Sequence, residues 1–283
     1  MPKSRRTPNG AILWDGPSLL NGDRIMVVIT GLIRSTVNRK TGDMYQTWVA
    51  PTDVVPSIAI ATGQDASVCG DCPLRKDICY VNSMGINSMW TAHQTNPLPR
   101  LDERAFLEIK RSGIPLRITA YGDPAATPFE AWEPLLKAVP FATGYTHQWR
   151  NCDHRWRRHL MASVETERAA LEAQQMGWRT FRIISSGDAY LPGEILCPNT
   201  QNKTINCREC KLCDGAGDSA GAYASKKPNI VNPVHGVRWK KSSWEAMQGL
   251  PPGISPIAHS NSDEVSLSPL IPQKSQVGAS SLA

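Results

Sequence analysis

The placement of cysteine most constrains how this chain of 283 residues can fold, because seven of its eight cysteines fall in two regions. Only Cys152 stands apart from both. The basic N-terminus leads into no apolar segment with a small-residue cleavage site, so we expect a cytoplasmic protein. In a reducing compartment thiols serve metals or catalysis more often than disulfides. The alternative, a set of buried and unreactive cysteines, fits two separate groups poorly. We therefore expect metal centres.

The first cysteine group consists of Cys69, Cys72 and Cys79. Gly70 permits a tight turn inside it, and Pro73 ends any local helix. Three thiolates so close in sequence predict a metal centre. Its fourth position is either open to a ligand or filled by the remote Cys152, which could equally be a core residue.

The second cysteine group consists of Cys207, Cys210 and Cys213, with Cys197 ten residues upstream. Gaps of two residues also occur in bacterial ferredoxins, where such thiolates hold iron–sulfur clusters. Zinc sites more often use separated pairs of ligands. We therefore expect a [4Fe–4S] cluster here, with zinc as the alternative. Three nearby cations would offset the negative charge of the thiolates: Lys203, Arg208 and Lys211.

The composition is that of a globular chain with no membrane span. Hydrophobic residues make up 41% and charged residues 20%, enough to bury a core. The longest apolar stretch, residues 25–33, is interrupted by Thr30 and Gly31 and is far too short to cross a bilayer. We expect no membrane partner. The formal net charge of +6 is compatible with a nucleic-acid partner but does not require one.

Hydrophobic patterning predicts an α/β fold. Two β-rich runs flank residues 38–43 and predict an N-terminal hairpin with a glycine-containing loop, acting as a cap or edge element. Beyond it, we expect helices at 86–93, 101–111, 129–139 and 165–176. We expect strands at 116–120, 141–145, 160–164, 178–184, 194–196 and 230–234.

This alternation predicts parallel strands with crossover helices. A full eightfold barrel needs about 250 residues, more than the alternating part supplies. We therefore expect a partial (β/α) barrel, with an open doubly wound sheet as the alternative. It would occupy a single metal-binding domain at residues 11–249, between a basic disordered tail at 1–10 and a disordered, proline-rich tail at 250–283.

Polar residues follow the predicted strands, at the end where parallel folds bind ligands. Helix capping and loop polarity explain some of them. The group His147, Gln148, Trp149 and Arg150 is harder to explain that way, because four recognition-capable side chains follow one apolar strand. We expect a catalytic or substrate-binding role for His147, Gln148 and Arg150. The other strand ends carry Tyr121-Gly122-Asp123-Pro124, Ser163, Glu165, Ser185-Ser186-Gly187-Asp188, Cys197-Pro198 and His235-Gly236.

A three-cysteine group followed by alternating strands and helices resembles the radical S-adenosylmethionine enzymes. In that family three cysteines hold a [4Fe–4S] cluster in a partial barrel and leave the fourth iron site to the methionine moiety. The run 118–124, Ile-Thr-Ala-Tyr-Gly-Asp-Pro, is similar to the family's Gly-Gly-Glu-Pro-like motif after the second strand. The run 160–165 resembles its later strand ending in a serine and an acidic residue. The second cysteine group resembles the auxiliary cluster of some members.

The resemblance covers residues 65–236 and implies site roles. S-adenosylmethionine would contact Tyr121, Gly122, Asp123 and Pro124 on one strand end, and Ser163 and Glu165 on another. The chain also resembles uncharacterised phage-encoded proteins of radical-enzyme-like type, which share the Cys79-Tyr80 step, so the cytoplasm would be that of a host. The chain departs from the family's Cys-x3-Cys-x2-Cys pattern, because its spacing is Cys-x2-Cys-x6-Cys.

Two other functions remain open on the sequence alone. One is a nucleic-acid-binding or replication-related protein with structural metal centres, indicated by cations interleaved with aromatics in residues 150–159 and 239–244. Those segments could equally be solvated helix faces with buried tryptophans. The other is a non-catalytic electron carrier or redox sensor. We expect no hydrolase, because no serine triad order, phosphate-binding glycine loop or His-Glu-x-x-His motif stands out.

Overall fold

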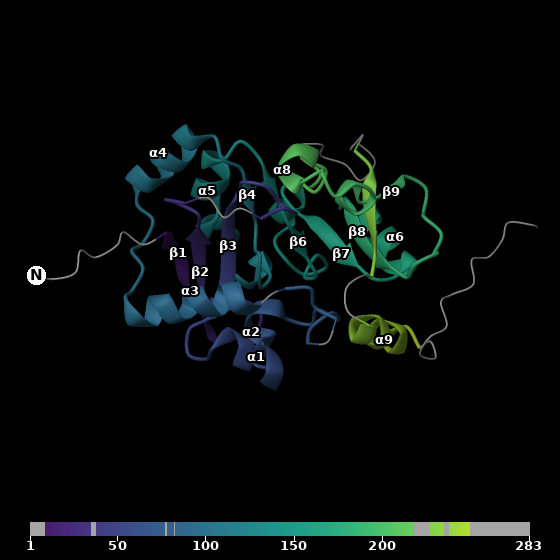
Figure 1. The fold of residues 1–283 in the computed structure, drawn as a ribbon, viewed down its shortest axis with the longest axis horizontal. Coiled ribbons are helices and arrows are strands. Elements are labelled where there is room, and N and C mark those ends of the chain that lie inside the picture. The colour runs from purple at the N-terminus through teal and green to yellow at the C-terminus, as the bar shows by residue number, and fades with distance from the viewer. Residues whose placement is uncertain are drawn as a thin grey trace, which may run out of the picture.

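The computed structural model describes residues 9–34, 38–76, 78–81, 83–217, 227–234 and 238–249, the last of these without the side chains of 238–241. It is a mixed α/β structure with two five-stranded sheets that contain parallel strands (Figure 1). Most of both predicted tails, and the strand-end residues His235 and Gly236, lie outside the described residues.

The first sheet has the strand order β1-β2-β3-β4-β5. Its strands are β1 (Gly10–Pro17), β2 (Arg24–Thr30), β3 (Tyr45–Pro51), β4 (Leu116–Arg117) and β5 (Ala142–Thr143). β1, β2 and β3 pair antiparallel, whereas β3, β4 and β5 are parallel. The predicted hairpin is thus confirmed as β2 and β3. Strand β1 was not predicted, and it begins at Gly10, inside the segment expected to be a tail.

The second sheet is parallel throughout, with the order β6-β7-β8-β10-β9. Its strands are β6 (Tyr145–Thr146), β7 (Met161–Val164), β8 (Thr180–Ile184), β9 (Glu194–Leu196) and β10 (Asn229–Pro233). Only Gly144 separates β5 from β6, so the second sheet begins where the first ends. A Cβ at Gly144 would lie 2.6 Å from the Leu160 side chain and 2.8 Å from that of Ile118, which leaves room only for glycine. Each of the six strands predicted after residue 86 has a counterpart, but 116–120 is shorter than expected and 141–145 is divided at Gly144 into β5 and β6, which belong to different sheets.

Helices and 3-10 turns connect the strands. They are α1 (Pro56–Thr62), α2 (Ala66–Cys69), α3 (Ser83–Thr95), α4 (Glu103–Ser112), η1 (Pro124–Ala126), η2 (Phe129–Ala131), α5 (Glu133–Ala138), η3 (His154–Arg158), α6 (Glu167–Gln175), α7 (Pro198–Gln201), α8 (Cys207–Cys210) and α9 (Arg238–Met247). The predicted helix at 129–139 is divided into η2 and α5, and Pro134 lies in the first turn of α5, where its missing N–H removes no helical hydrogen bond. Asp102 and Thr166 cap the N-termini of α4 and α6.

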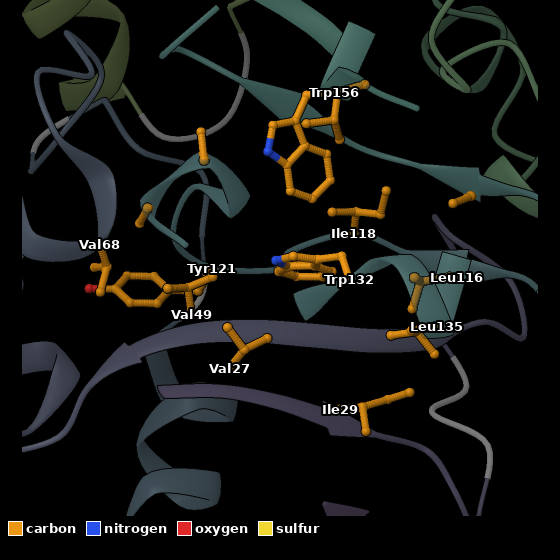
Figure 2. Close-up of a cluster of buried hydrophobic side chains, with 14 of the residues drawn as sticks. Val27, Ile29, Val49, Val68, Leu116, Ile118, Tyr121, Trp132, Leu135 and Trp156 are labelled. Carbon is orange, nitrogen blue, oxygen red and sulfur yellow. The ribbon is translucent and has the colours of Figure 1, made fainter. Parts of the chain in front are cut away.

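The main core lies between the first sheet and the helices that cover it (Figure 2). Trp132 and Trp156 are fully buried there, with ring centroids 5.5 Å apart in an edge-to-face arrangement. The Trp132 indole N–H donates to Thr127 Oγ1 over 2.7 Å, so its polar atom is satisfied. Within the described residues, no helix is long and apolar enough to cross a membrane.

A buried ion pair fixes the far side of the second sheet. Arg182 on β8 donates to Glu194 on β9 through Nε (2.9 Å) and Nη2 (2.6 Å), across the intervening β10. The two side chains are only 4% and 0% exposed. The backbone N–H of Leu191 also donates to Glu194, which closes the loop before β9.

We expect Glu194→Gln to lower the free energy of unfolding by about 3 kcal/mol or more, because it leaves Arg182 buried without its counter-charge. Urea denaturation measures this. The control is Glu172→Gln, which breaks the exposed pair with Arg150 and should change stability little. Equal effects of the two substitutions would show that the buried pair contributes no more than a surface one.

Candidate metal centres and active-site cavity

One cavity of about 450 Å³ brings the two cysteine groups together. Its lining includes residues at the carboxyl ends of strands from both sheets, as is usual for parallel α/β folds. Its volume is that of a small-molecule site. Seven of the eight cysteines line it: Cys69, Cys72, Cys79, Cys197, Cys207, Cys210 and Cys213.

An arginine holds the loop of the first cysteine group in place. Arg75 donates to Asp65 Oδ1 (2.5 Å) and to the carbonyls of Gly63 (2.7 Å) and Gly70 (2.8 Å). Burial raises the pKa of Cys69, and the charges of Cys72, Asp65 and Cys79 raise it further. The loop that carries the first group is therefore held by bonds that do not involve sulfur.

The hairpin loop holds the second cysteine group. The N–H groups of Cys207 and Arg208 donate to the carbonyls of Lys40 and Thr41, each over 3.0 Å, and the Arg208 side chain pairs with Asp43 at 3.1 Å. The helix α8 also has a capping box formed by Asn206 and Glu209. The N–H of Gly144 donates to the carbonyl of Cys213 over 3.2 Å. The hairpin, which was expected only to be a cap or an edge element, thus holds the second cysteine group in position through its loop.

The four cysteines of the second group line the same cavity and differ in their surroundings. Burial, with smaller contributions from the charges of Cys207, Cys197 and Cys210, raises the pKa of Cys213 to about 12, although a hydrogen bond from Tyr145 opposes the shift. Burial also raises the pKa of Cys207, whereas the charges of Arg117 and Lys40 lower it. Within the described residues, no three His, Cys, Asp or Glu side chains are arranged to hold a single metal ion.

Tyr121, Gly122 and Asp123, in the segment after β4, line the cavity. Asp123 is buried and accepts hydrogen bonds from the N–H groups of Ala125 (3.0 Å) and His147 (2.8 Å) and from Thr146 Oγ1 (2.8 Å). It therefore ties the end of β4 to the end of β6, and burial raises the pKa of its carboxyl. Just before it, Thr119 has a φ of +47°, a strained conformation for a β-branched residue.

Two buried hydroxyl groups in the cavity wall have no hydrogen-bond partner among the described residues. They belong to Tyr121 and Thr143, which are 2% and 1% exposed. Buried hydroxyls without partners are costly, so a ligand that bonds to them is physically favoured. Burial also raises the pKa of Tyr121, so its hydroxyl remains a donor.

His147 lies between an acid and a cysteine. Its Nε2 is 2.8 Å from Glu165 Oε1, and the imidazole also hydrogen-bonds to Cys72. Burial would lower the pKa of His147, but these two hydrogen bonds raise it well above its usual value. His147 and Ser163 line the cavity, whereas Glu165 is outside the lining and reaches it only through His147.

Other predicted site residues lie outside the cavity lining. Gln148 donates to Asp71 over 2.8 Å and so braces the first cysteine group. Arg150 forms a bidentate pair with Glu172 at 2.7 and 2.8 Å, and its guanidinium lies 3.9 Å from the ring centroid of Trp149. The expectation that Gln148 and Arg150 face a substrate in this cavity does not fit these positions. Pro124 and Cys152 are also absent from the lining.

The aromatic residues of the cation-rich segment are not available for base stacking. Trp149 and Trp156 are 3% and 1% exposed, and both belong to the main core. Arg155 is paired with Asp153 and Glu130. Trp244 is buried against Ser185, whereas the side chain of Trp239 lies outside the described residues. This arrangement matches the alternative expectation of a solvated segment with buried tryptophans.

Sequence reasoning missed many residues of the lining, among them Lys40, Arg117 and Thr143. Arg117 carried a signal, because it is the one charged residue between the buried Leu116 and Ile118 of an apolar strand. Lys40 was read as part of a hairpin loop, and Thr143 as an ordinary strand residue.

Comparisons with known proteins add no further information on the site. No protein-family model matches the chain, and searches of curated proteins and of solved structures found no match to it. The function must therefore be argued from the site itself.

The isolated Cys152 should react slowly in the folded protein. Burial raises its pKa to about 12, whereas an ordinary cysteine ionises near about 8.5. Because only the thiolate is nucleophilic, we expect iodoacetamide at pH 8.5 to label Cys152 about a thousandfold more slowly in the folded chain than in urea. Peptide mass spectrometry measures both rates. Labelling within tenfold of the denatured rate would contradict this placement.

Proposed function

We propose that this chain is an iron–sulfur protein that acts as a radical S-adenosylmethionine-like enzyme on a small substrate. The observation that carries the proposal is the convergence of seven cysteines, from two remote regions of the chain, on one cavity. Inert cysteines have no physical reason to gather in this way. All eight are free thiols, which favours a cytoplasmic location.

The residues present fit two clusters of different kinds. The first group offers three thiols, which would leave one iron open to a ligand inside the cavity. The second group offers four, the number that completes a [4Fe–4S] cluster. The ligand sulfurs of a cubane stand further apart than those around a single ion, so an iron–sulfur cluster suits these dispersed thiols better than zinc. The charges of Arg117 and Lys40 would offset the thiolates of the second group.

The finer fold assignment belongs to the same proposal. We infer a partial (β/α) barrel that runs from β3 through β4, β5, β6, β7, β8 and β10 to β9. The parallel pairing on either side of Gly144 supports it, as does the position of the cavity at the carboxyl ends of these strands. A barrel interior would enclose a substrate on several sides.

When bound, a reduced cluster and S-adenosylmethionine would supply a one-electron cleavage of a carbon–sulfur bond in the cofactor. The chain's own residues would bind and orient. Asp123 uses three donors, whereas a carboxylate can accept about four, so it can take one more from an amino group. The hydrogen bond from His147 holds Cys72, and Trp48, Tyr80 and Phe181 line the cavity with apolar surface that excludes water.

The cavity also bears on the competing functions. An electron carrier needs no enclosed space beside its cluster, and here both cysteine groups face one of small-molecule size. A nucleic-acid binder would use exposed aromatics, and Trp149 and Trp156 are buried. These observations favour an enzyme.

We expect the chain, purified or reconstituted without oxygen, to be brown and to contain about eight iron and eight sulfide, as two [4Fe–4S] clusters require. Cys72→Ala or Cys210→Ala should each reduce both contents by about half, because each group holds its own cluster. Cys152→Ala is the matched control and should retain all of the iron. Pale protein with stoichiometric zinc would contradict the proposal.

We further expect dithionite-reduced protein to convert S-adenosylmethionine into 5′-deoxyadenosine, measured by liquid chromatography. Cys72→Ala should abolish the product, because it removes a ligand of the first group. Cys152→Ala should leave it unchanged. If protein with full iron content yields no product, the enzyme assignment fails and an electron carrier remains.

A further inference from the structure

The cavity has two chemically different ends. At the end with the first cysteine group, burial and the charges of Cys69 and Cys79 raise the pKa of Tyr121. His147 forms a hydrogen bond with Cys72 at the same end. At the end with the second group, Tyr145 forms a hydrogen bond with Cys213. Burial raises the pKa of Cys207 there, whereas the positive charges of Arg117 and Lys40 lower it. A ligand between the two groups would therefore meet an acid-bearing end and a cationic end.

A polar row forms the floor of the cationic end. Gln46, Arg117 and Thr143 are register partners on the adjacent parallel strands β3, β4 and β5. Partners on neighbouring strands project from the same face of a sheet, and all three line the cavity. Arg117 precedes Tyr121 by four residues and Thr143 precedes His147 by four, so the row lies deeper along the strands than the residues at their ends.

Two members of the row lack partners. The half-buried guanidinium of Arg117 packs over the Tyr145 ring, 5.2 Å from its centroid, but it donates to no acceptor among the described residues. The hydroxyl of Thr143 is 1% exposed and also has no partner there. The negative charge of a bound cluster could by itself explain why Arg117 lies here. It does not explain the hydroxyl of Thr143, which is neutral and offsets no charge.

We propose that Arg117 and Thr143 bind an oxyanion, a carboxylate or phosphate carried by the substrate. A guanidinium offers two parallel N–H donors to such a group, and a neighbouring hydroxyl offers a third. Lys40, which also lines the cavity, adds a second positive charge. As a substrate class for the enzyme, this inference rests on the proposed function, although the binding itself does not.

The test uses the full chain, purified without oxygen, with its iron content measured. Inorganic phosphate and acetate are titrated against chloride of matched ionic strength, and Kd is obtained from the rise in Tm. We expect saturable stabilisation by one of them, and the tighter of the two identifies the group that the substrate carries. Arg117→Gln should weaken binding at least tenfold. Arg104→Gln is the matched control, because it removes an equal charge from an exposed position on α4 and should leave Kd unchanged.

Thr143→Val separates binding from structure. Valine keeps the shape and removes an unpartnered hydroxyl, so Tm without anion should stay the same or rise, whereas Kd should weaken about three- to tenfold. A fall in Tm with unchanged Kd would overturn the proposal. So would equal Kd values for the wild type and Arg117→Gln, or no stabilisation by either anion. Loss of iron from Arg117→Gln with unchanged Kd would assign Arg117 to the second cysteine group instead. If the purified chain contains no iron but binds the anion with the expected Kd values, the proposed function is refuted and the anion site is retained.

Discussion

The close packing at Gly144 is the constraint on which the site depends. A Cβ at this position would clash with Leu160 and Ile118. Because glycine has none, the chain can pass directly from β5 into β6, and the second sheet continues from the first. The same residue donates its N–H to Cys213 and accepts from Met161. One glycine thus joins the two sheets and anchors the second cysteine group, so strands from both sheets end at one cavity.

The cavity between the two sheets has two ends with different polar residues. One end has Asp123 and the His147–Glu165 pair, which hydrogen bonds hold in place. The other end has Arg117 and Thr143, whose polar groups are left without partners among the described residues. Polar groups that have hydrogen-bond partners keep a site in its shape, and buried polar groups that lack them can bond to a ligand. The hydroxyl of Tyr121 at the first end also lacks a partner among the described residues, so groups able to bond to a ligand lie at both ends. Their presence at both ends is the physical basis for placing a substrate between the two cysteine groups.

Much of this arrangement follows from sequence, because strand periodicity and cysteine spacing are local signals. The strands at 160–164 and 194–196 were found nearly to the residue, and the cysteines singled out in the sequence, other than Cys152, line the cavity. Orientation is not local. Gln148 and Arg150 follow a strand that ends at the site, yet Asp71 and Glu172 turn them away from it. The docking of Cys207 on the loop at Lys40 joins residues far apart in sequence, which no window of the sequence reveals.

The supports of both cysteine groups are themselves free of sulfur. Arg75 ties the first loop to Asp65 and two carbonyls, and Arg179 holds the segment after Cys213 by donating to Asp214 and to the carbonyl of Gly215. A small zinc domain folds only around its metal because it has no such framework. Here hydrogen bonds and buried charge pairs already position the loops, so metal would enter a largely organised site. Metal binding, as proposed, would then add to the stability of the fold without being the condition for it.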